Sequence, residues 1–292
     1  MQGAERSLLL LRCRLGETVQ PLSQREYDQL FTVLREYGPV PDPEREIDEE
    51  VLCGLGFSPE LAQRISRLLS RPKQPEEYLE PVPDVSVLTR ISPAFPRKLG
   101  VLGGECPAAL FCRGDVSLFQ EPCVSLVGSR LLFERGKRFA QRIGRMAAEE
   151  GYVLVSGNAP GADRAAQEAC LEAGGRVIAF VPDALGDCPV TKNVLYVSDE
   201  GHDCSFTSGR ALRRNHYIHA MGDKTFVAQC PKPFGGTWSG AEYNLRRGLS
   251  GVYVLNDGSE GALALGELGA VLLEDEPASI AELRPSQLSI FD

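Results

Sequence analysis

Short apolar segments alternate with amphipathic helical segments through the second half of the chain. The apolar segments are rich in β-branched side chains, which is typical of strands buried on both faces of a sheet. Because helical segments lie between most of them, the pattern predicts an α/β fold with a parallel, doubly wound sheet. The predicted strands are 123–127, 152–155, 176–181, 194–197, 224–229 and 252–255, and the predicted helices are 134–150, 162–173, 209–221 and 238–248.

The chain divides into three regions by composition. Residues 1–80 have a helical pattern and are expected to form a small N-terminal domain. A proline-rich join at 71–86 leads into the α/β domain, which is expected to span 81–275. Residues 276–292 are expected to form an acidic, loosely structured tail.

The N-terminal region contains two clear helix signals. Ser58 and Pro59 are typical of a helix start, with a serine cap and a proline at the first helical position. The turn 54–56 joins two short helices and resembles a helix-hairpin-helix or SAM-like domain, although a plain packing corner fits the pattern better, because no Lys or Arg closely flanks the turn. The segment 22–38 is expected to place four apolar side chains on one helical face: Tyr27, Leu30, Phe31 and Leu34.

The overall charge restricts how this chain could bind a polyanion. Its net charge is −9, from 31 basic and 40 acidic residues, so binding to nucleic acid would need a local basic patch. The apolar run from Leu8 to Leu11 is too short for a signal sequence or a membrane span. We therefore expect a cytoplasmic protein without a membrane partner.

The nine cysteines predict reduced, mostly buried thiols. Their number is odd and no C-x-x-C motif occurs, which argues against a disulfide framework. A zinc site from Cys204 with His202 or His216 is conceivable, but the spacing fits no standard site. We expect neither a metal nor a cofactor.

Three loops rich in small residues follow the carboxyl ends of predicted strands. They are 128–130, 156–163 and 235–237. A strand followed by a small-residue loop and a helix N-terminus can bind phosphate, because free N–H groups and the positive helix end point at the anion. Ligands of doubly wound sheets bind at this edge. Together the three loops predict a site for a phosphate-rich ligand.

Basic residues concentrate beside these loops. Arg130 and Arg214 lie at junctions of loop and helix, where we expect them to contact the ligand, whereas Arg142 and Arg145 fit a solvated helix face. Four aromatic residues near the loops could stack on bases or belong to the core: Phe133, Tyr217, Phe234 and Trp238.

Several segments resemble the DNA-processing protein A family, DprA, also called Smf. They occur in the family's order, over roughly residues 85 to 275, and comprise "LTRISPAFPRKL", "CPAALFCRGDVSLFQEPCVSLVGSR", "LVSGNAPGADRAAQEACLEAGGRVIAF", "RRNHYIHAMGD" and "GGTWSGAEYNLRRG". The resemblance implies a Rossmann-like fold, single-stranded DNA binding at the strand-end pocket, and a homodimer. It also implies loading of the recombinase RecA onto DNA during competence and transformation.

The resemblance also implies which residues bind DNA. Gln167 departs from the family pattern, which usually has histidine there, and the C-terminal winged helix of many members is missing, so we expect a diverged member. The expected DNA-binding residues are Gly128, Ser129, Arg130, Lys137, Ser156, Gly157, Gly161, Asp163, Arg213, Arg214, Asn215, Gly235, Gly236 and Thr237.

An enzyme or a nucleotide sensor of the same superfamily is the alternative. The segment 235–242 is similar to a motif of the nucleoside-monophosphate phosphoribohydrolases, in which Glu242 would be the catalytic carboxylate. Trp238 stands where that motif has glycine, and its bulk would obstruct close approach of a phosphate. No convincing pair of nucleophile and base is present, so we expect no catalytic activity.

The end of the chain resembles the peptide by which bacterial proteins dock on the replicative sliding clamp. The expected clamp contacts are Gln287, Leu288, Ile290 and Phe291. The apolar members of this group could instead anchor the tail on the protein's own α/β domain.

Overall fold

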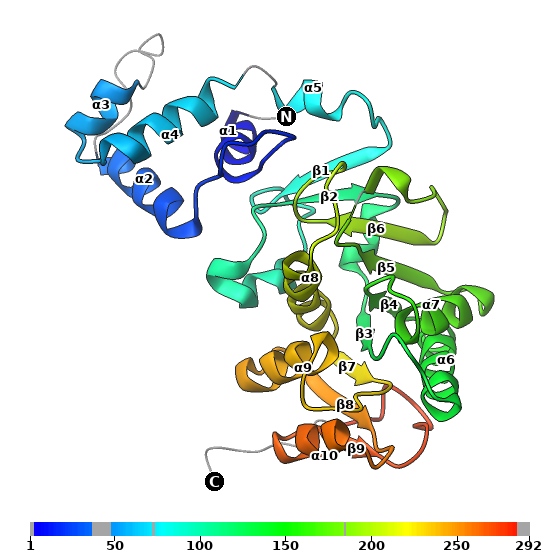
Figure 1. Ribbon diagram of the computed structural model, residues 1–292. Helices are drawn as coiled ribbons and strands as arrows, with labels where there is room; N and C mark the ends of the chain where they lie inside the picture. The colour runs from blue at the N-terminus through cyan, green and yellow to red at the C-terminus, as the bar shows by residue number, and fades with distance from the viewer. Residues whose placement is uncertain (1–2, 37–47, 72–73, 184, 285–292) are drawn as a thin grey trace.

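The computed structural model describes residues 3–36, 48–71, 74–183 and 185–284 (Figure 1). Helices form the N-terminal part, where Leu30, Leu52, Ile65 and Leu68 belong to a small core of its own. The Ser58 hydroxyl accepts a hydrogen bond from the N–H of Leu61, which confirms the predicted helix start. These helices are α1 (Gly3–Arg12), α2 (Gln24–Glu36), α3 (Glu49–Gly54), α4 (Pro59–Leu69) and α5 (Pro75–Leu79).

Within the described residues, nine strands form one sheet in the order β1-β2-β6-β5-β4-β3-β7-β8-β9. The strands from β6 to β9 in this order are parallel, and β1 and β2 are antiparallel to their neighbours. The predicted doubly wound, mostly parallel sheet is thereby confirmed. The strands are β1 (Val85–Thr89), β2 (Ala109–Arg113), β3 (Cys123–Val127), β4 (Val153–Ser156), β5 (Arg176–Phe180), β6 (Val194–Ser198), β7 (Lys224–Val227), β8 (Gly251–Leu255) and β9 (Val271–Leu273).

Helices cover the two faces of the parallel part of the sheet (Figure 1). On one face α6 (Glu134–Glu149) packs closely on α7 (Ala162–Glu172), and Phe139 and Ile143 fill the core beneath them. On the other face lie α8 (Ser208–Met221), α9 (Gly236–Arg247) and α10 (Glu260–Glu267), with Tyr217 and Leu265 in a second core. Among the residues that the structure describes, three 3₁₀ helices complete the fold: η1 (Arg97–Glu105), η2 (Val116–Gln120) and η3 (Leu185–Asp187).

The strand order places a switch point beside β3. The chain proceeds from β3 to β4, β5 and β6 on one side, and then α8 carries it back to β7 on the other side of β3. The loops after β3 and β7 therefore diverge to opposite faces and leave a crevice between them, which is where such sheets bind ligands. The loop after β4 opens at the same edge.

The structure differs from the sequence-based expectation at several elements. The sequence pattern does not predict the strands β1, β2 and β9 or the helix α10, because β1 and β2 pair antiparallel outside the alternating pattern and β9 has three residues. Phe31 is 61% exposed and does not share the buried face of Leu30. Successive helical residues point about 100° apart, so the side chain beside a buried one turns away from the core.

The packed chain continues past residue 275. Ile280 is fully buried, and the Glu150 carboxylate accepts hydrogen bonds from the N–H groups of Ile280 and Ala281, both at 2.9 Å. The expected clamp-binding peptide, 287–291, lies outside the described residues. No helix among the described residues is long and apolar enough to cross a membrane.

The nine cysteines are free, as predicted. Most are buried, and Cys53 is exposed. Burial raises the pKa of the Cys170 and Cys230 thiols to about 11, so these thiols are neutral at physiological pH.

Candidate functional site

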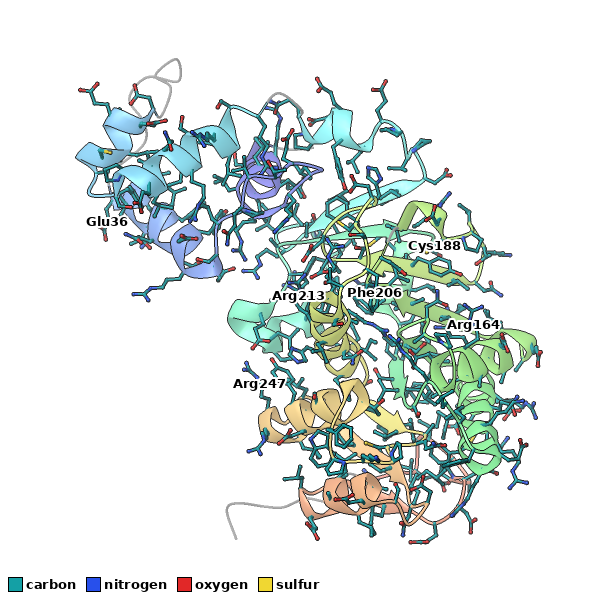
Figure 2. The ribbon with its side chains drawn as sticks, in the orientation of Figure 1. Glu36, Arg164, Cys188, Phe206, Arg213 and Arg247 are labelled. Carbon is teal, nitrogen blue, oxygen red and sulfur yellow. The ribbon has the colours of Figure 1, made fainter. Side chains whose placement is uncertain are left out.

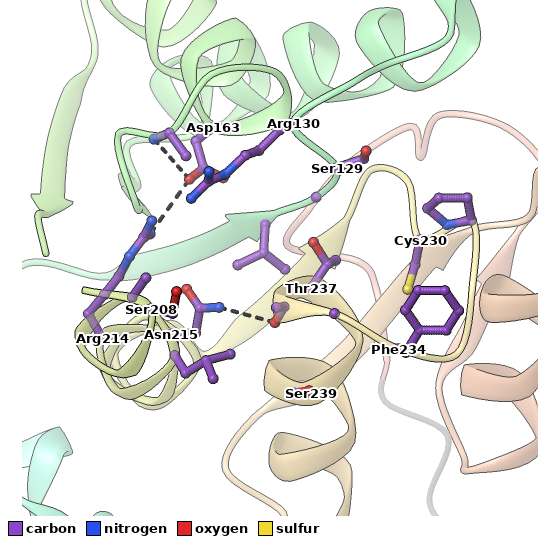
Figure 3. A pocket seen from close by; sticks show the side chains of 18 of the residues that line it. Ser129, Arg130, Asp163, Ser208, Arg214, Asn215, Cys230, Phe234, Thr237 and Ser239 are labelled. Carbon is purple, nitrogen blue, oxygen red and sulfur yellow. Dashed lines mark hydrogen bonds and ion pairs between the residues drawn. The ribbon is translucent and has the colours of Figure 1, made fainter. Parts of the chain in front are cut away.

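A cavity of about 600 Å³ opens at the switch point, between the loops after β3 and β7 and the first half of α8 (Figure 3). A smaller cavity of about 200 Å³ adjoins it, bounded by the loop after β4 and by Asp183. The structure thus joins the three small-residue loops that the sequence singled out. The predicted residues that line the larger cavity are Gly128, Ser129, Arg130, Asp163, Arg214, Asn215, Gly235, Gly236 and Thr237.

Two glycines allow the loops after β3 and β4 to lie against each other. A Cβ atom on Gly128 would lie 2.6 Å from the Cβ of Ala162. Gly161 has φ of +86°, and a Cβ there would lie 2.4 Å from the carbonyl oxygen of Ser129. That carbonyl accepts a hydrogen bond from the N–H of Ala162, at 3.1 Å. Because neither position has room for a side chain, glycine at 128 and 161 allows the two loops to pack together and so shapes the cavity.

Asp163 and Arg214 form a buried ion pair beneath the loop after β4 (Figure 3). Nη1 of Arg214 lies 3.6 Å from Oδ2 of Asp163, and that oxygen also accepts hydrogen bonds from the N–H groups of Gly157 and Ala159. Burial raises the pKa of the Asp163 carboxyl, and the Arg214 charge opposes this shift. The guanidinium occupies the space of a side chain at Gly157, where a Cβ would lie 1.1 Å from Nη1.

Arg130 differs from the other arginines around the cavity. It is exposed, lines both cavities, and has no acidic partner among the described residues. Its guanidinium lies over the Phe206 ring, with Cζ 5.9 Å from the ring centroid. Arg130 therefore presents an uncompensated positive charge to a ligand.

Most other arginines near the cavity already pair with carboxylates. Arg213 lies 2.8 Å from Asp199 and also contacts Glu200, which binds Arg210 as well. Arg246 pairs with Glu242 in α9, at 2.8 Å. The acids beside α8 lie upstream of it, in the loop that follows β6. Because these arginines are paired with carboxylates, the surface around the cavity is less positive than the number of basic residues in the sequence indicates.

Besides Gly161, three predicted DNA-binding residues line neither cavity. Lys137 is exposed on α6, and Arg213 binds the loop after β6. Ser156 is fully buried, where its hydroxyl accepts a hydrogen bond from Gln167. The glutamine that departs from the family pattern thus supports the end of β4.

The opposite wall of the cavity is the start of α9. This helix begins at Gly236, so the N–H groups of its first turn have no partner within the helix. The side-chain amide of Asn215 donates a hydrogen bond to the Gly236 carbonyl, at 3.1 Å, and so fixes α8 against α9 (Figure 3). The Thr237 hydroxyl completes a polar wall that suits an anion.

Several residues that line the larger cavity were not expected from the sequence. The loop after β6 also begins at this edge of the sheet. Its position after the predicted strand 194–197 is the signal that could have identified the lining residues at the start of α8. Of the four aromatic residues singled out, Phe234 lines the cavity, while Tyr217 is buried in the core. The lining residues of the larger cavity that were not predicted to bind DNA are Val127, Ala159, Phe206, Ser208, Ala211, Leu212, Cys230, Pro231, Phe234 and Ser239.

Glu242, the carboxylate of the enzyme alternative, does not line either cavity. It accepts a hydrogen bond from the Trp238 indole, at 3.1 Å, in addition to its pairing with Arg246. Among the described residues, no group of three or more His, Cys, Asp or Glu side chains could hold a metal ion.

The chain is similar in sequence to curated DprA and Smf proteins. The chain is 36% identical over 81 residues to the DNA processing protein DprA of Streptococcus pneumoniae, and this match spans 28% of each chain. A match to the Smf protein of Synechocystis spans 25% of that protein, so the chain covers only part of the first curated relatives.

Two solved structures resemble this fold. The DNA processing protein A of Streptococcus pneumoniae matches with a TM-score of 0.74 and 23% identity, over 97% of this chain and 99% of that one. The Helicobacter pylori protein, whose structure describes a single-stranded DNA binding mode, matches with a TM-score of 0.56 and 27% identity, over 65% of this chain and 91% of that one. The family model for DNA recombination-mediator protein A matches residues 86–283, which is more than half of the chain. This chain therefore belongs to the DNA recombination-mediator protein A family.

Proposed function

We propose that this protein binds single-stranded DNA in the cavity at the carboxyl ends of β3, β4 and β7. The observation that carries the proposal is Arg130, an exposed cation in the cavity without an acidic partner among the described residues. The single-stranded DNA binding mode described for the Helicobacter pylori relative supports this ligand.

The cavity offers complementary groups to a sugar-phosphate backbone. Arg130 would neutralise one phosphate, and the first turn of α9 with Thr237 would receive another. Phe206 and Phe234 are 48% and 68% exposed, so their rings are accessible for stacking with bases. The buried Arg214, whose charge is balanced by Asp163, holds the floor of the cavity beneath these groups.

Salt-dependent binding of a fluorescent oligo-dT tests this function. We expect Arg130→Ala to weaken binding by about 1.5–3 kcal/mol, because a hydrogen bond to a charged group is lost. The slope of log affinity against log salt should fall by about one contact. Arg145→Ala, on the exposed face of α6, is the matched control and should bind like the wild type. Salt-independent binding, or an unaffected Arg130→Ala variant, would contradict the proposal.

We further propose that the protein mediates DNA recombination without turnover of DNA or nucleotides. Glu242 is already engaged by Trp238 and Arg246 outside the cavity, which disfavours a phosphoribohydrolase. Incubation with nucleoside monophosphates and with DNA, with and without magnesium, should release no base or ribose phosphate. A release that disappears in Glu242→Ala would favour the enzyme instead.

The family resemblance extends the proposal to partners. We propose that a homodimer loads the recombinase RecA onto bound DNA. From the separate resemblance of the tail to a clamp-binding peptide, we also propose that residues 287–291 dock on the sliding clamp. A synthetic peptide of residues 284–292 should bind the clamp with a Kd of about 1 μM. Phe291→Ala should abolish that binding. If the full-length protein does not bind the clamp, this partner is excluded.

A further inference from the structure

Tyr78, in α5, connects the N-terminal part of the chain to the loop that precedes α8. Its side chain is 6% exposed. The hydroxyl donates a hydrogen bond to Oδ1 of Asp203, at 2.5 Å, and accepts one from the N–H of His202, at 3.1 Å. Nε2 of His202 in turn donates to the Tyr78 carbonyl, at 2.9 Å, and the two rings lie 4.4 Å apart. Tyr78 thus holds this loop by both its side chain and its main chain.

Two glycines, Gly201 and Gly16, lie against the Tyr78 side chain. A Cβ atom on Gly201 would lie 2.2 Å from the Tyr78 hydroxyl oxygen. Gly16, in the loop after α1, would place a Cβ 3.4 Å from the Tyr78 ring and 3.5 Å from the Asp203 carboxylate. Chain segments before α2 and before α8 therefore meet around one side chain.

The same loop forms part of the cavity wall only a few residues later. Phe206 lines both cavities and lies beneath Arg130. The Thr207 hydroxyl then accepts a hydrogen bond from the N–H of Arg210 and so begins α8. Figure 2 labels Phe206, which precedes this helix, and Arg213, which belongs to it.

The loop has a second attachment at its beginning. Asp199 accepts hydrogen bonds from Tyr217 and Arg213, both at 2.8 Å, and Glu200 pairs with Arg210 and Arg213. These contacts fix the two residues before Gly201 to α8 itself. In the stretch from Gly201 to Asp203, the contacts with Tyr78 reach instead to the N-terminal part of the chain.

We propose that Tyr78 is a positioning residue for the DNA cavity, holding residues 201–203 so that Phe206 stays beside Arg130. This inference rests on the proposed function. A loop that is already ordered loses less conformational freedom when its aromatic ring stacks on a base, so affinity rises without any contact between Tyr78 and DNA. Through Tyr78, the N-terminal helices would support binding at a cavity to which they contribute no lining residue.

Tyr78→Phe tests the proposal, because it keeps the ring and removes only the hydroxyl. We expect binding of oligo-dT to weaken about three- to tenfold, which corresponds to the loss of ordinary hydrogen bonds. The matched control is Tyr253→Phe, since the buried Tyr253 hydroxyl has no partner among the described residues. This control should bind like the wild type.

A double variant separates positioning from a general loss of stability. Phe206→Ala should cost less affinity in the Tyr78→Phe background than in the wild type, because the ring is no longer held. If the two substitutions reduce the affinity by the same factors in combination as they do separately, the proposal is overturned. If Tyr78→Phe does not fold, Asp203→Ala removes the same hydrogen bond from the loop side and should give the same loss.

The outcomes distinguish this inference from the proposed function. Wild-type protein that binds no oligo-dT, or binds it independently of Arg130, would refute the function and the inference together. Normal binding that depends on Arg130, with Tyr78→Phe equal to the Tyr253→Phe control, would refute the positioning role alone.

Discussion

Arg214 of α8 and Asp163 of α7 lie 3.6 Å apart, and each side chain is only 8% exposed. The two helices lie on opposite faces of the sheet, so the ion pair connects the faces around the carboxyl end of β4. Arg214 also fills the space beside Gly157. This one pair therefore fixes both the floor of the cavity and the loop above it.

Asp163→Asn should destabilise the protein strongly. The substitution leaves the buried Arg214 charge without its counter-charge, which typically costs about 3–5 kcal/mol. Urea denaturation measures the change in the free energy of unfolding. Glu149→Gln, which breaks the more exposed pair with Arg142, is the control and should cost less than about 1 kcal/mol. Equal effects of the two variants would argue against a structural role for the buried pair.

Gly157→Ala should displace Arg214 and lower DNA affinity. The new Cβ would overlap with Nη1 at 1.1 Å, so the guanidinium must leave its position beside Asp163. We expect a loss of about 1–3 kcal/mol in stability, by overpacking, together with weaker binding of oligo-dT. At Gly209, in contrast, a Cβ would lie 4.0 Å from the nearest atom, so Gly209→Ala should fold and bind normally. A tolerated Gly157→Ala would show that Arg214 is not needed in this place.

The buried His219 makes stability depend on pH. Burial lowers its pKa to about 3, whereas a histidine in the unfolded chain titrates near 6.5, at about its ordinary value. Between these values the unfolded state binds a proton that the folded state excludes. The free energy of unfolding should therefore be fully retained above about pH 6.5 and fall below it, by at most about 1.4 kcal/mol per pH unit.

His219→Gln isolates this contribution. Asn244 donates a hydrogen bond to Nδ1 of His219, at 3.0 Å, and a glutamine oxygen could accept it. The free energies of unfolding of the wild type and the variant should converge as pH falls from about 7 to about 5, because only the wild type must keep a buried histidine neutral. Curves that remain parallel over this interval would contradict the prediction.

Glu150→Ala should release the segment around Ile280. Its carboxylate accepts hydrogen bonds from two backbone N–H groups and from the Ser279 hydroxyl, at 3.2 Å. Because Ile280 is fully buried, we expect a loss of about 1–3 kcal/mol in stability and faster proteolysis of this segment. Glu149→Ala, on the adjacent exposed position, serves as the control. Unchanged proteolysis would indicate that apolar packing alone holds the segment.

The sequence predicts the parallel part of the fold well, because its signals are local. Strand and helix patterns between Cys123 and Leu255 are sufficient to locate the edge of the sheet where the loops meet. The antiparallel strands β1 and β2 lie outside that alternation, and their pairing depends on contacts between distant segments. The burial of Ile280 could not be predicted, because a single buried isoleucine gives no periodic signal.

The candidate site is predicted less completely than the fold. Arg130 and Arg214 both line the cavity, but one is exposed without an acidic partner among the described residues and the other is buried in an ion pair. Composition alone could not separate these environments. The acids that neutralise Arg213 lie 13 and 14 residues earlier, in a loop whose path no local pattern reveals.

The cavity can form only after β7 has paired with β3. Ser125 lies opposite Thr225, so the two strands that flank the crevice are widely separated along the chain. A nascent polypeptide that has emerged only as far as β6 lacks α8, and with it Arg214, as well as the whole wall formed by α9. During synthesis, the capacity to bind a ligand must therefore arise late, after most of the sheet has already been made.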